Sequence, residues 1–433
     1  MDLRFLPELP LTLSYPLLFG VLLVAGMLGG EAARALRLPR VVGYVLVGFA
    51  IAPIAAAINI GPLLDEARIF VDIGLGLVLF DLGRRMDLAW LKRDWTLAAS
   101  GIAESLLTFA LVFAALAWLD VAPLAAGIAA AIAMATSPAV VLLIAQDTRS
   151  EGQVTERALT LVALNSLLAS VVVTMLTASV HYEVRLDLDT AVLHPLYLFA
   201  GSLALGGLTA RVARLLARQL ERSPELHFTL LAGLILAAVG IAQAVKLSVI
   251  LALLAFGMFA RNDRNRHDLV NVDLGRASRL FYIVLFVITG ASLPLSSFET
   301  AGWAALAFIG ARAAGKFLGV VAIAPLGGMR WRQSVALGAA LLPMSALALL
   351  LLHDVTRLHP AFGAEIAAVV IAAVIVMEIA GPLATQWAFR FAGEAAPPPD
   401  PLAATRPPAA RPAEPPNPPQ PAQPPRPAEA KDA

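Results

Sequence analysis

Residues 133–139 read Ala-Met-Ala-Thr-Ser-Pro-Ala, which places two hydroxyls and a proline inside a long apolar stretch. Proline removes one amide donor from a helix and frees a carbonyl one turn earlier. A bilayer tolerates this only where protein, water or a ligand meets the freed groups. Pro-Met-Ser at 343–345 repeats the interruption about 205 residues later. Paired breaks at matching places of two halves are typical of the ion or substrate site of an inverted-repeat transporter.

The composition indicates a membrane protein. The chain is 59% hydrophobic and 15% charged, whereas a soluble domain carries about a quarter charged residues. Apolar runs near 20 residues recur throughout, as transmembrane helices require. The net charge of +1 gives no reason to expect a nucleic-acid partner, and the absence of cysteine excludes disulfides and thiol-ligated metals.

We therefore expect an all-α polytopic membrane protein with about 13 transmembrane helices over residues 1–392. The expected spans are about 14–30, 41–59, 68–83, 96–118, 122–145, 158–180, 192–212, 226–244, 247–260, 280–298, 301–325, 334–353 and 363–390. Residues 393–433 carry half of the thirty prolines, so this segment is expected to be a disordered cytoplasmic tail.

Lys and Arg in the connections predict the orientation. The loops between successive expected spans lie alternately on the two sides of the membrane. One set of loops carries twenty basic residues, and the other carries four, namely Arg68, Arg185, Lys246 and Arg357. Because cytoplasmic loops carry the excess of basic residues, the N-terminus is expected outside and the C-terminus in the cytoplasm of a cell (inner) membrane protein.

An internal repeat has the same offset as the two breaks. Val-Leu-Phe at 78–80, followed by Gly83, resembles Val-Leu-Phe at 284–286, followed by Gly290. The repeats are expected at about 41–180 and 247–390. Each half holds an odd number of helices, so the halves have opposite orientation and their discontinuous helices are expected to cross.

The broken helices offer oxygen ligands. The carbonyls freed by Pro138, with the hydroxyls of Thr136 and Ser137, form a candidate cation-coordinating patch. The alternative is a simple proline kink, and the second break at Pro343 and Ser345 favours the functional interpretation.

Polar side chains on the following span are the next candidates. Asn165 and Ser166 lie near its middle, where a polar group needs a hydrogen bond. They either take part in ion binding or join two helices.

Two cations lie deep in the span at 301–325. Arg312 and Lys316 are one turn apart and share a face. Either they extend to the interface or they need a buried partner. The acidic candidates are Asp72, Asp81, Glu104, Glu365 and Glu378. We expect Asp81 to pair with Arg84 and Arg85, and we expect Glu104 to be the titrating group.

Enzymatic chemistry is not expected. The six histidines lie in loops or near span ends without metal-ligand spacing, and no nucleotide-binding fingerprint or nucleophile–base arrangement is present. We therefore predict neither a metal nor another cofactor.

Five segments carry a family resemblance. They are Leu-Pro-Arg-Val-Val-Gly-Tyr-Val-Leu-Val-Gly at 38–48, Gly-Leu-Gly-Leu-Val-Leu-Phe at 74–80 with Gly83, Ala-Thr-Ser-Pro-Ala at 135–139, Gly-Lys-Phe-Leu-Gly at 315–319, and Glu-Ile-Ala-Gly-Pro at 378–382. In these segments residues 14–392 resemble the monovalent cation:proton antiporter superfamily, which includes the sodium/hydrogen exchangers and their potassium-efflux relatives. The resemblance implies a sodium/proton antiporter-like fold, with a dimerisation domain and a core domain that moves like an elevator. It also implies a homodimer and exchange of Na⁺ or K⁺ for H⁺.

The chain departs from that family at the position of its principal acid. The resemblance implies an aspartate where Ser166 stands, and many members carry Arg-Gly-Glu where this chain has Met-Ser-Ala at 344–346. Serine cannot exchange a proton for a cation at physiological pH. Coupling is therefore expected to move to Glu104, Asp72 or another acid, or to be lost. The alternatives are a differently coupled anion or solute transporter, and a non-transporting homologue that keeps the fold for sensing or assembly.

Overall fold

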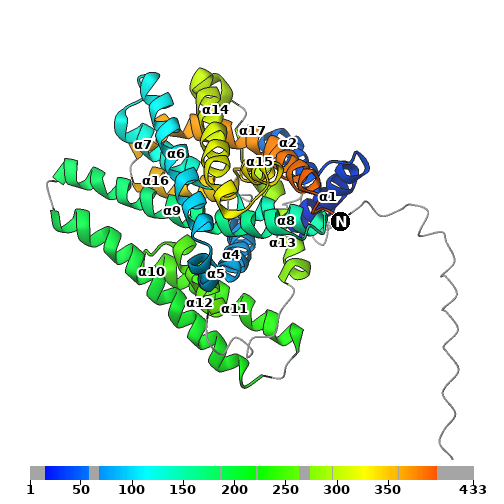
Figure 1. Ribbon diagram of the computed structural model, residues 1–433. Helices are drawn as coiled ribbons and strands as arrows, with labels where there is room; N and C mark the ends of the chain where they lie inside the picture. Colours follow the sequence, from blue (N-terminus) through cyan, green and yellow to red (C-terminus); the bar gives the residue numbers. More distant parts are fainter. Residues whose placement is uncertain are drawn as a thin grey trace, which may run out of the picture. The chain divides into compact units, whose positions relative to one another are not determined.

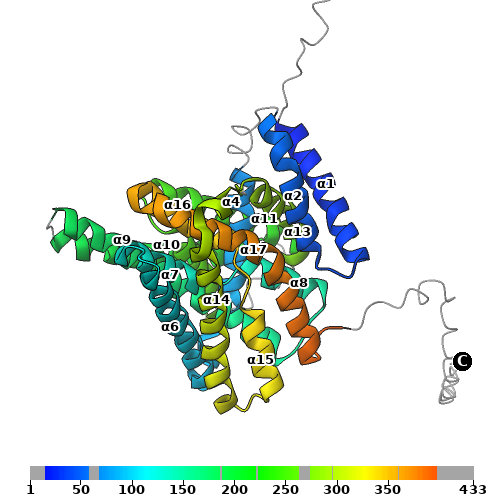
Figure 2. The ribbon, with the colours of Figure 1, turned by 90° about the horizontal axis from the view of Figure 1, so that it is seen from above.

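The fold is helical throughout the part of the chain that the structure describes. A computed structural model describes residues 15–57, 68–185, 188–220, 223–262, 274–294, 296–358 and 360–396. Every regular element within these ranges is a helix. Residues 15–395 belong to one compact unit, whose helices are arranged as in Figures 1 and 2. The expected tail lies outside the described residues from position 397 onward.

The helices fall into two halves along the sequence. The first half contains α1 (Tyr15–Ala35), α2 (Arg40–Ala57), α4 (Arg68–Arg85), α5 (Leu88–Arg93), α6 (Trp95–Trp118), α7 (Pro123–Met134), α8 (Pro138–Asp147) and α9 (Gln153–Arg185). Between the halves come α10 (Leu188–Ala217) and α11 (Pro224–Ala244). The second half contains α12 (Val249–Asn262), α13 (Leu274–Ala291), α14 (Ser297–Ile323), the 3₁₀ turn η1 (Ala324–Gly327), α15 (Trp331–Ala340), α16 (Ala346–Leu358) and α17 (Pro360–Ala392).

The apolar helices make this a multi-pass membrane protein. Among the described residues, eight helical segments are long and apolar enough to cross a membrane, as their apolar side chains predict. All thirteen expected spans overlap helices. The spans 122–145 and 334–353 each contain two helices, because the predicted breaks are present, and the span 280–298 extends past the end of α13 at Ala291.

Reciprocal glycine contacts relate the two halves. Gly48 on α2 packs against Gly290 on α13, and Gly83 on α4 packs against Gly257 on α12. A Cβ on Gly48 would lie 2.3 Å from the Val287 carbonyl oxygen, so only glycine permits this approach. Each half thus contributes one helix to each pair, as expected for two interlocked inverted repeats.

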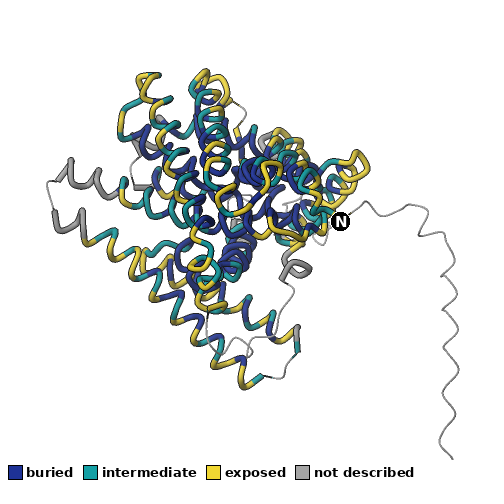
Figure 3. The backbone as a smooth tube through the Cα atoms, viewed as in Figure 1, coloured by how far each residue is buried: buried dark blue, intermediate teal, exposed yellow. Residues whose placement is uncertain are grey.

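The broken helices lie at the centre of the molecule. Residues 125–145, which make up most of α7 and α8 and the break between them, are buried (Figure 3). On one side of this segment α6 packs along α14, the most extensive helix–helix contact in the structure. The two views in Figures 1 and 2 show these two helices side by side. This arrangement brings polar residues of α6 and α14 to the breaks.

A carboxylate beyond α17 caps another helix. Glu394 accepts hydrogen bonds of 2.8 Å from the amides of Val154 and Thr155 and from the Thr155 hydroxyl. These amides belong to the first turn of α9, where donors have no intrahelical partner and negative charge is favoured. The contact joins the end of the second half to the start of α9 in the first half, across 240 and 239 residues of sequence.

Candidate functional site

The first break separates α7 from α8. Helix α7 ends at Met134, and Ala135 and Ser137 are extended, with ψ of 139° and 109°. Pro138 is the first residue of α8, a position where its missing amide costs no helical hydrogen bond. Thr136 and Ser137 are buried. Residues 135–137 thus form a short extended segment deep inside the protein, as the sequence predicted.

The second break separates α15 from α16 and lies against the first. The Thr136 hydroxyl donates to the Leu341 carbonyl at 2.9 Å, and the Ser137 amide donates to the Pro343 carbonyl at 2.9 Å. The Thr385 hydroxyl on α17 donates to the Ala340 carbonyl at 3.3 Å. The two discontinuous helices therefore meet directly, in buried surroundings.

Arg312 joins the two breaks. Its guanidinium is 1% exposed and donates to carbonyls of both discontinuous helices. These hydrogen bonds run to Ala133 (3.0 Å), Ala135 (2.8 Å), Leu342 (2.5 Å) and Pro343 (3.1 Å). A planar guanidinium with five donors is suited to such an array. It compensates the negative ends of α7 and α15 at the same time.

Lys316 forms a buried ion pair with Glu104. The ammonium nitrogen lies 2.9 Å from Glu104 Oε2, with both side chains fully buried, and it also donates to the Met134 carbonyl. Among the acids considered from the sequence whose side chains the structure describes, Glu104 is thus the one that reaches Lys316. The Glu365 side chain lies outside the described residues. The approach depends on Gly319, where a Cβ would lie 2.3 Å from the Glu104 Cα.

Asn165 links this ion pair to the first break. Its Nδ2 donates to Glu104 Oε1 at 2.9 Å and to the Thr136 hydroxyl at 3.0 Å, while its Oδ1 accepts from the Thr136 amide at 3.3 Å. Glu104, Lys316, Asn165 and Thr136 therefore form one connected polar cluster, in which the carboxylate is held by an ammonium and an amide.

The carbonyls expected to coordinate a cation are engaged in this conformation. Those of Ala133, Met134 and Ala135 accept hydrogen bonds from Arg312 and Lys316. Fixed cations thus satisfy the main-chain oxygens at the first break, and a transported cation has to compete with them or bind elsewhere.

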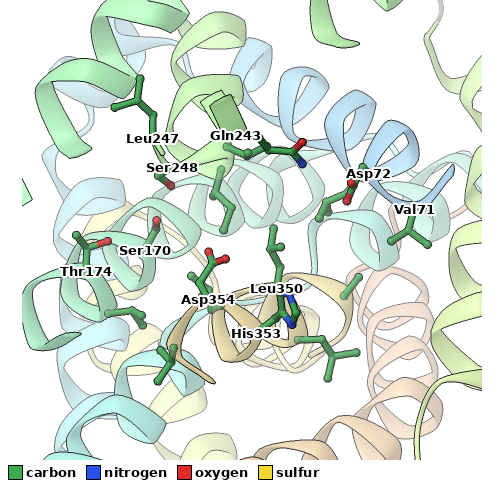
Figure 4. A pocket seen from close by; sticks show the side chains of 18 of the residues that line it. Val71, Asp72, Ser170, Thr174, Gln243, Leu247, Ser248, Leu350, His353 and Asp354 are labelled. Atoms are coloured by element: carbon green, nitrogen blue, oxygen red, sulfur yellow. The ribbon is translucent and has the colours of Figure 1, made fainter. Parts of the chain in front are cut away.

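A cavity of about 630 Å³ opens beside the second break. It is lined by residues of α4, α9, α10, α11, α12, α13 and α16 and of the connection between α11 and α12. Figure 4 shows Asp72 and Asp354 on opposite sides of it, with Ser170 and Gln243 nearby. Its lining includes Ala346, the first residue of α16. The cavity therefore reaches the start of the helix that follows the second break.

Away from the cavity, ion pairs join α1, α2 and α8. Arg40, at the start of α2, lies 3.1 Å from the Asp147 carboxylate at the end of α8 and 2.8 Å from Glu31 on α1. Ser170 on the cavity wall lies 17 residues after the start of α9, about 25 Å along the helix. The cavity is thus lined by α9 from the middle of the helix onward, whereas the ion pair lies close to its start.

Comparisons with known proteins identify the family. The family model for the transmembrane sodium/hydrogen exchanger matches residues 19–390. The chain belongs to the sodium/hydrogen exchanger family. The fold is similar to that of the sodium proton antiporter MjNhaP1 from Methanocaldococcus jannaschii at pH 8, with TM-score 0.67, 19% identity, and coverage of 88% of this chain and 98% of that chain. A second structure of that antiporter, from an electron-microscopy map, gives TM-score 0.65 at the same identity and coverage. A search of curated proteins finds no match.

The resemblance implies an aspartate on α9 where this exchanger has Ser166. The Ser166 hydroxyl is buried and donates to the Val162 carbonyl of its own helix at 2.6 Å. The structure therefore brings Asn165 into the cluster through its side chain, whereas the Ser166 hydroxyl is used within α9. Asp81 pairs with Arg84 and Arg85, at 3.2 and 3.6 Å, as expected.

A second buried carboxyl of this exchanger lies near the breaks. Glu378 on α17 is fully buried, and neither of its oxygens has a hydrogen-bond partner among the described residues. Ser345 lies beside it, with a hydroxyl that is also buried and unpartnered. Sequence reasoning named Glu378 among the possible partners of Lys316 but did not select it. Its place seven residues before Thr385, on the same helical face, was the available signal.

Proposed function

We propose that the protein is a secondary transporter that exchanges a monovalent cation, Na⁺ or K⁺, for H⁺. The observation that supports this most directly is the buried Glu104–Lys316 ion pair beside two crossed helix breaks. It lies within the fold of the sodium/hydrogen exchanger family. An ionisable pair at this depth is costly and marks an ion pathway in membrane proteins.

Coupling follows from competition for the Glu104 carboxylate. A cation that binds Glu104 displaces the Lys316 ammonium, which then remains buried without a counter-charge. An isolated buried ammonium is strongly unfavourable, so Lys316 releases its proton and becomes a neutral amine. The reverse step, protonation of Lys316, restores the ion pair and expels the cation. This atypical arrangement replaces the competition that a carboxylate at Ser166 would provide.

Alternating access is supported by the cavity and by the Arg40–Asp147 ion pair, which lies away from the cavity and close to the start of α9. The excess of Lys and Arg in the connections that include Arg40 supports a cytoplasmic position for it. We therefore propose that the cavity faces outward, with the N-terminus outside and the C-terminus in the cytoplasm of a cell (inner) membrane protein. We propose an elevator-type movement of the helices around the breaks against α1, α2, α4 and α11–α13. We also propose a homodimer, as the family resemblance implies.

Proteoliposome flux tests this function. The wild-type protein is expected to dissipate a preset pH gradient on addition of NaCl or KCl, but not of choline chloride. Glu104→Gln is expected to abolish this response, while Glu299→Gln, the same change at an exposed site at the start of α14, leaves it unchanged.

Folding and function are separated by the double variant Glu104→Gln/Lys316→Met. Replacing both charges removes the uncompensated ammonium, and buried pairs tolerate such replacement well. We expect this variant to be monodisperse and inactive. Full activity in a folded Glu104→Gln protein would exclude the Glu104–Lys316 mechanism. Solute flux without a proton response would favour a differently coupled transporter, and no flux from a folded wild-type dimer would favour a sensing or assembly role.

A further inference from the structure

We propose that Glu378 and Ser345 form a second exchange site, at which a proton and a monovalent cation compete. The site is separate from the Glu104–Lys316 pair, and the proposal rests on the antiport function proposed above. It would give the protein an exchangeable carboxyl on α17 in place of the one missing from α9.

Burial without a partner requires Glu378 to be neutral in this conformation. Its exposure is 0%, and neither oxygen accepts a hydrogen bond from any described residue. An ionised carboxylate in such surroundings is far more costly than a protonated one. Glu104, by contrast, is compensated by Lys316 and Asn165. The two buried acids are therefore in opposite states, one ionised and one protonated.

The packing of α17 positions Glu378 at the second break. Gly381, one turn later, lies so close to the break that a Cβ there would be 2.6 Å from the Pro343 Cα. Thr385, another turn on, donates to the Ala340 carbonyl. These three residues share a face of α17. Glu378 is consequently directed to the side of the break where Ser345 precedes α16.

The start of α16 offers both a route and a favourable field. Ala346, the residue after Ser345, lines the cavity of about 630 Å³. The first amides of α16 have no intrahelical acceptor, so this end of a 13-residue helix favours negative charge. A cation and its remaining waters arriving from the cavity would meet the Ser345 hydroxyl and the Glu378 carboxyl together.

The charged groups buried near this site carry a net positive charge when Glu378 is protonated. Charged or titratable side chains on helices packed against α17 are Glu299, Arg312 and Lys316 on α14, Arg332 on α15, His353 and Asp354 on α16, Arg40 and Tyr44 on α2, Asp147 on α8, and Glu156 and Arg157 on α9. None of them hydrogen-bonds to Glu378. With Glu378 protonated, the buried group of Arg312, Lys316 and Glu104 carries one net positive charge, which favours loss of the Glu378 proton once water or a cation enters.

The exchange step conserves charge at the site. The protonated Glu378 carboxyl releases H⁺ to cavity water, and its carboxylate oxygens, with the Ser345 hydroxyl, coordinate the entering Na⁺ or K⁺. In reverse, H⁺ returns to the carboxylate and the cation leaves. No covalent bond other than the carboxyl O–H is broken or formed.

Cation-induced proton release in detergent solution tests this proposal without transport. The purified full-length protein, in weak buffer with a pH-indicator dye at neutral pH, is titrated with NaCl or KCl and with choline chloride as the control. Wild type is expected to release protons from both sites. Glu378→Gln is expected to release about one proton fewer per polypeptide, whereas Glu299→Gln releases as many as wild type. Glu104→Gln/Lys316→Met is expected to retain the release due to Glu378.

Ser345→Ala provides the second measurement, because it keeps the carboxyl. It is expected to weaken the apparent cation affinity about threefold to tenfold through loss of one ligand, with the amount of proton release unchanged. If Glu378→Gln is not monodisperse, the proposal is tested by Ser345→Ala alone, through the cation concentration that gives half-maximal proton release. Full proton release in folded Glu378→Gln, or an unchanged midpoint in Ser345→Ala, would overturn the second site. Release at equilibrium without flux in proteoliposomes would instead reject antiport and leave the site standing.

Discussion

The break between α7 and α8 and the break between α15 and α16 face each other but are satisfied differently. At the first, Asn165 bonds both the amide and the hydroxyl of Thr136, and fixed cations hold the adjacent carbonyls. At the second, the carbonyls are also paired, yet the Ser345 hydroxyl and the Glu378 carboxyl are buried without partners. Among the described residues that line the cavity, Ala346, directly after the second break, is the one that lies next to a break.

This difference suggests a division of labour within an inverted repeat. A break whose polar groups are saturated by the protein is suited to hold geometry. A break beside a buried oxygen without a hydrogen-bond partner is suited to bind a ligand reversibly. Such unsatisfied polar groups are costly and are retained where function requires them.

The largest expected effect is that of Arg312, which holds both breaks at once. Arg312→Gln removes donors from four carbonyls, of which three are buried and that of Leu342 is partly buried. We therefore expect a loss of about 3 kcal/mol or more of unfolding free energy. The apparent melting temperature in detergent measures this, with Arg211→Gln on the exposed face of α10 as the matched control. Equal melting temperatures for the two variants would show that the breaks hold their shape without the guanidinium.

A smaller effect compares the two breaks directly. Asn165→Ala removes three hydrogen bonds around Thr136 and Glu104 and is expected to cost about 2 kcal/mol. Thr385→Val removes one long hydrogen bond to the second break, at 3.3 Å, and is expected to cost less than about 1 kcal/mol. The same melting assay ranks them. A Thr385 variant as unstable as the Asn165 variant would contradict the view that the first break is the more rigidly held.

The smallest expected effect concerns the population of the conformation in which the cavity beside the second break is open. Arg40→Gln or Asp147→Asn breaks an ion pair whose side chains are 19% and 14% exposed, which is worth about 1 kcal/mol. That energy shifts a two-state equilibrium about fivefold. The chain has no cysteine, so alkylation of Leu350→Cys on the cavity wall reports the open population cleanly. We expect slower labelling in either variant and no further change in the double variant. Unchanged rates would mean that this pair does not hold the conformation.

Much of the fold follows from the sequence because the bilayer leaves few choices. Apolar runs of the right length predict helices, and prolines followed or preceded by hydroxyls predict where two of them break. Both breaks were predicted in this way, and the Asp81 ion pairs were predicted from the neighbouring Arg84 and Arg85. Glu104 was preferred among the acids from its depth in its helix, and the structure places it against Lys316.

The contacts of individual side chains did not follow from the sequence. Spacing shows that Arg312 and Lys316 share a face, but the carbonyls they reach lie on helices about 180 residues earlier, and on α15–α16. Asn165 and Ser166 are adjacent and polar, yet only the amide enters the cluster, since the hydroxyl bonds one turn back in its own helix. Glu378 is notable because its buried carboxyl oxygens have no hydrogen-bond partner among the described residues. Such a lack of partners depends on the tertiary packing and cannot be predicted from local sequence.

The clasp between Glu394 and the start of α9 sets a limit on how the C-terminus can be shortened. Deleting everything after residue 396 leaves that carboxylate in place, whereas ending the chain at Gly393 would strip the Val154 and Thr155 amides of their acceptor. A fusion partner or affinity tag attached directly after Ala395 would also be anchored to the helix that carries Asn165. Its position would then report whether that helix moves when a cation is added.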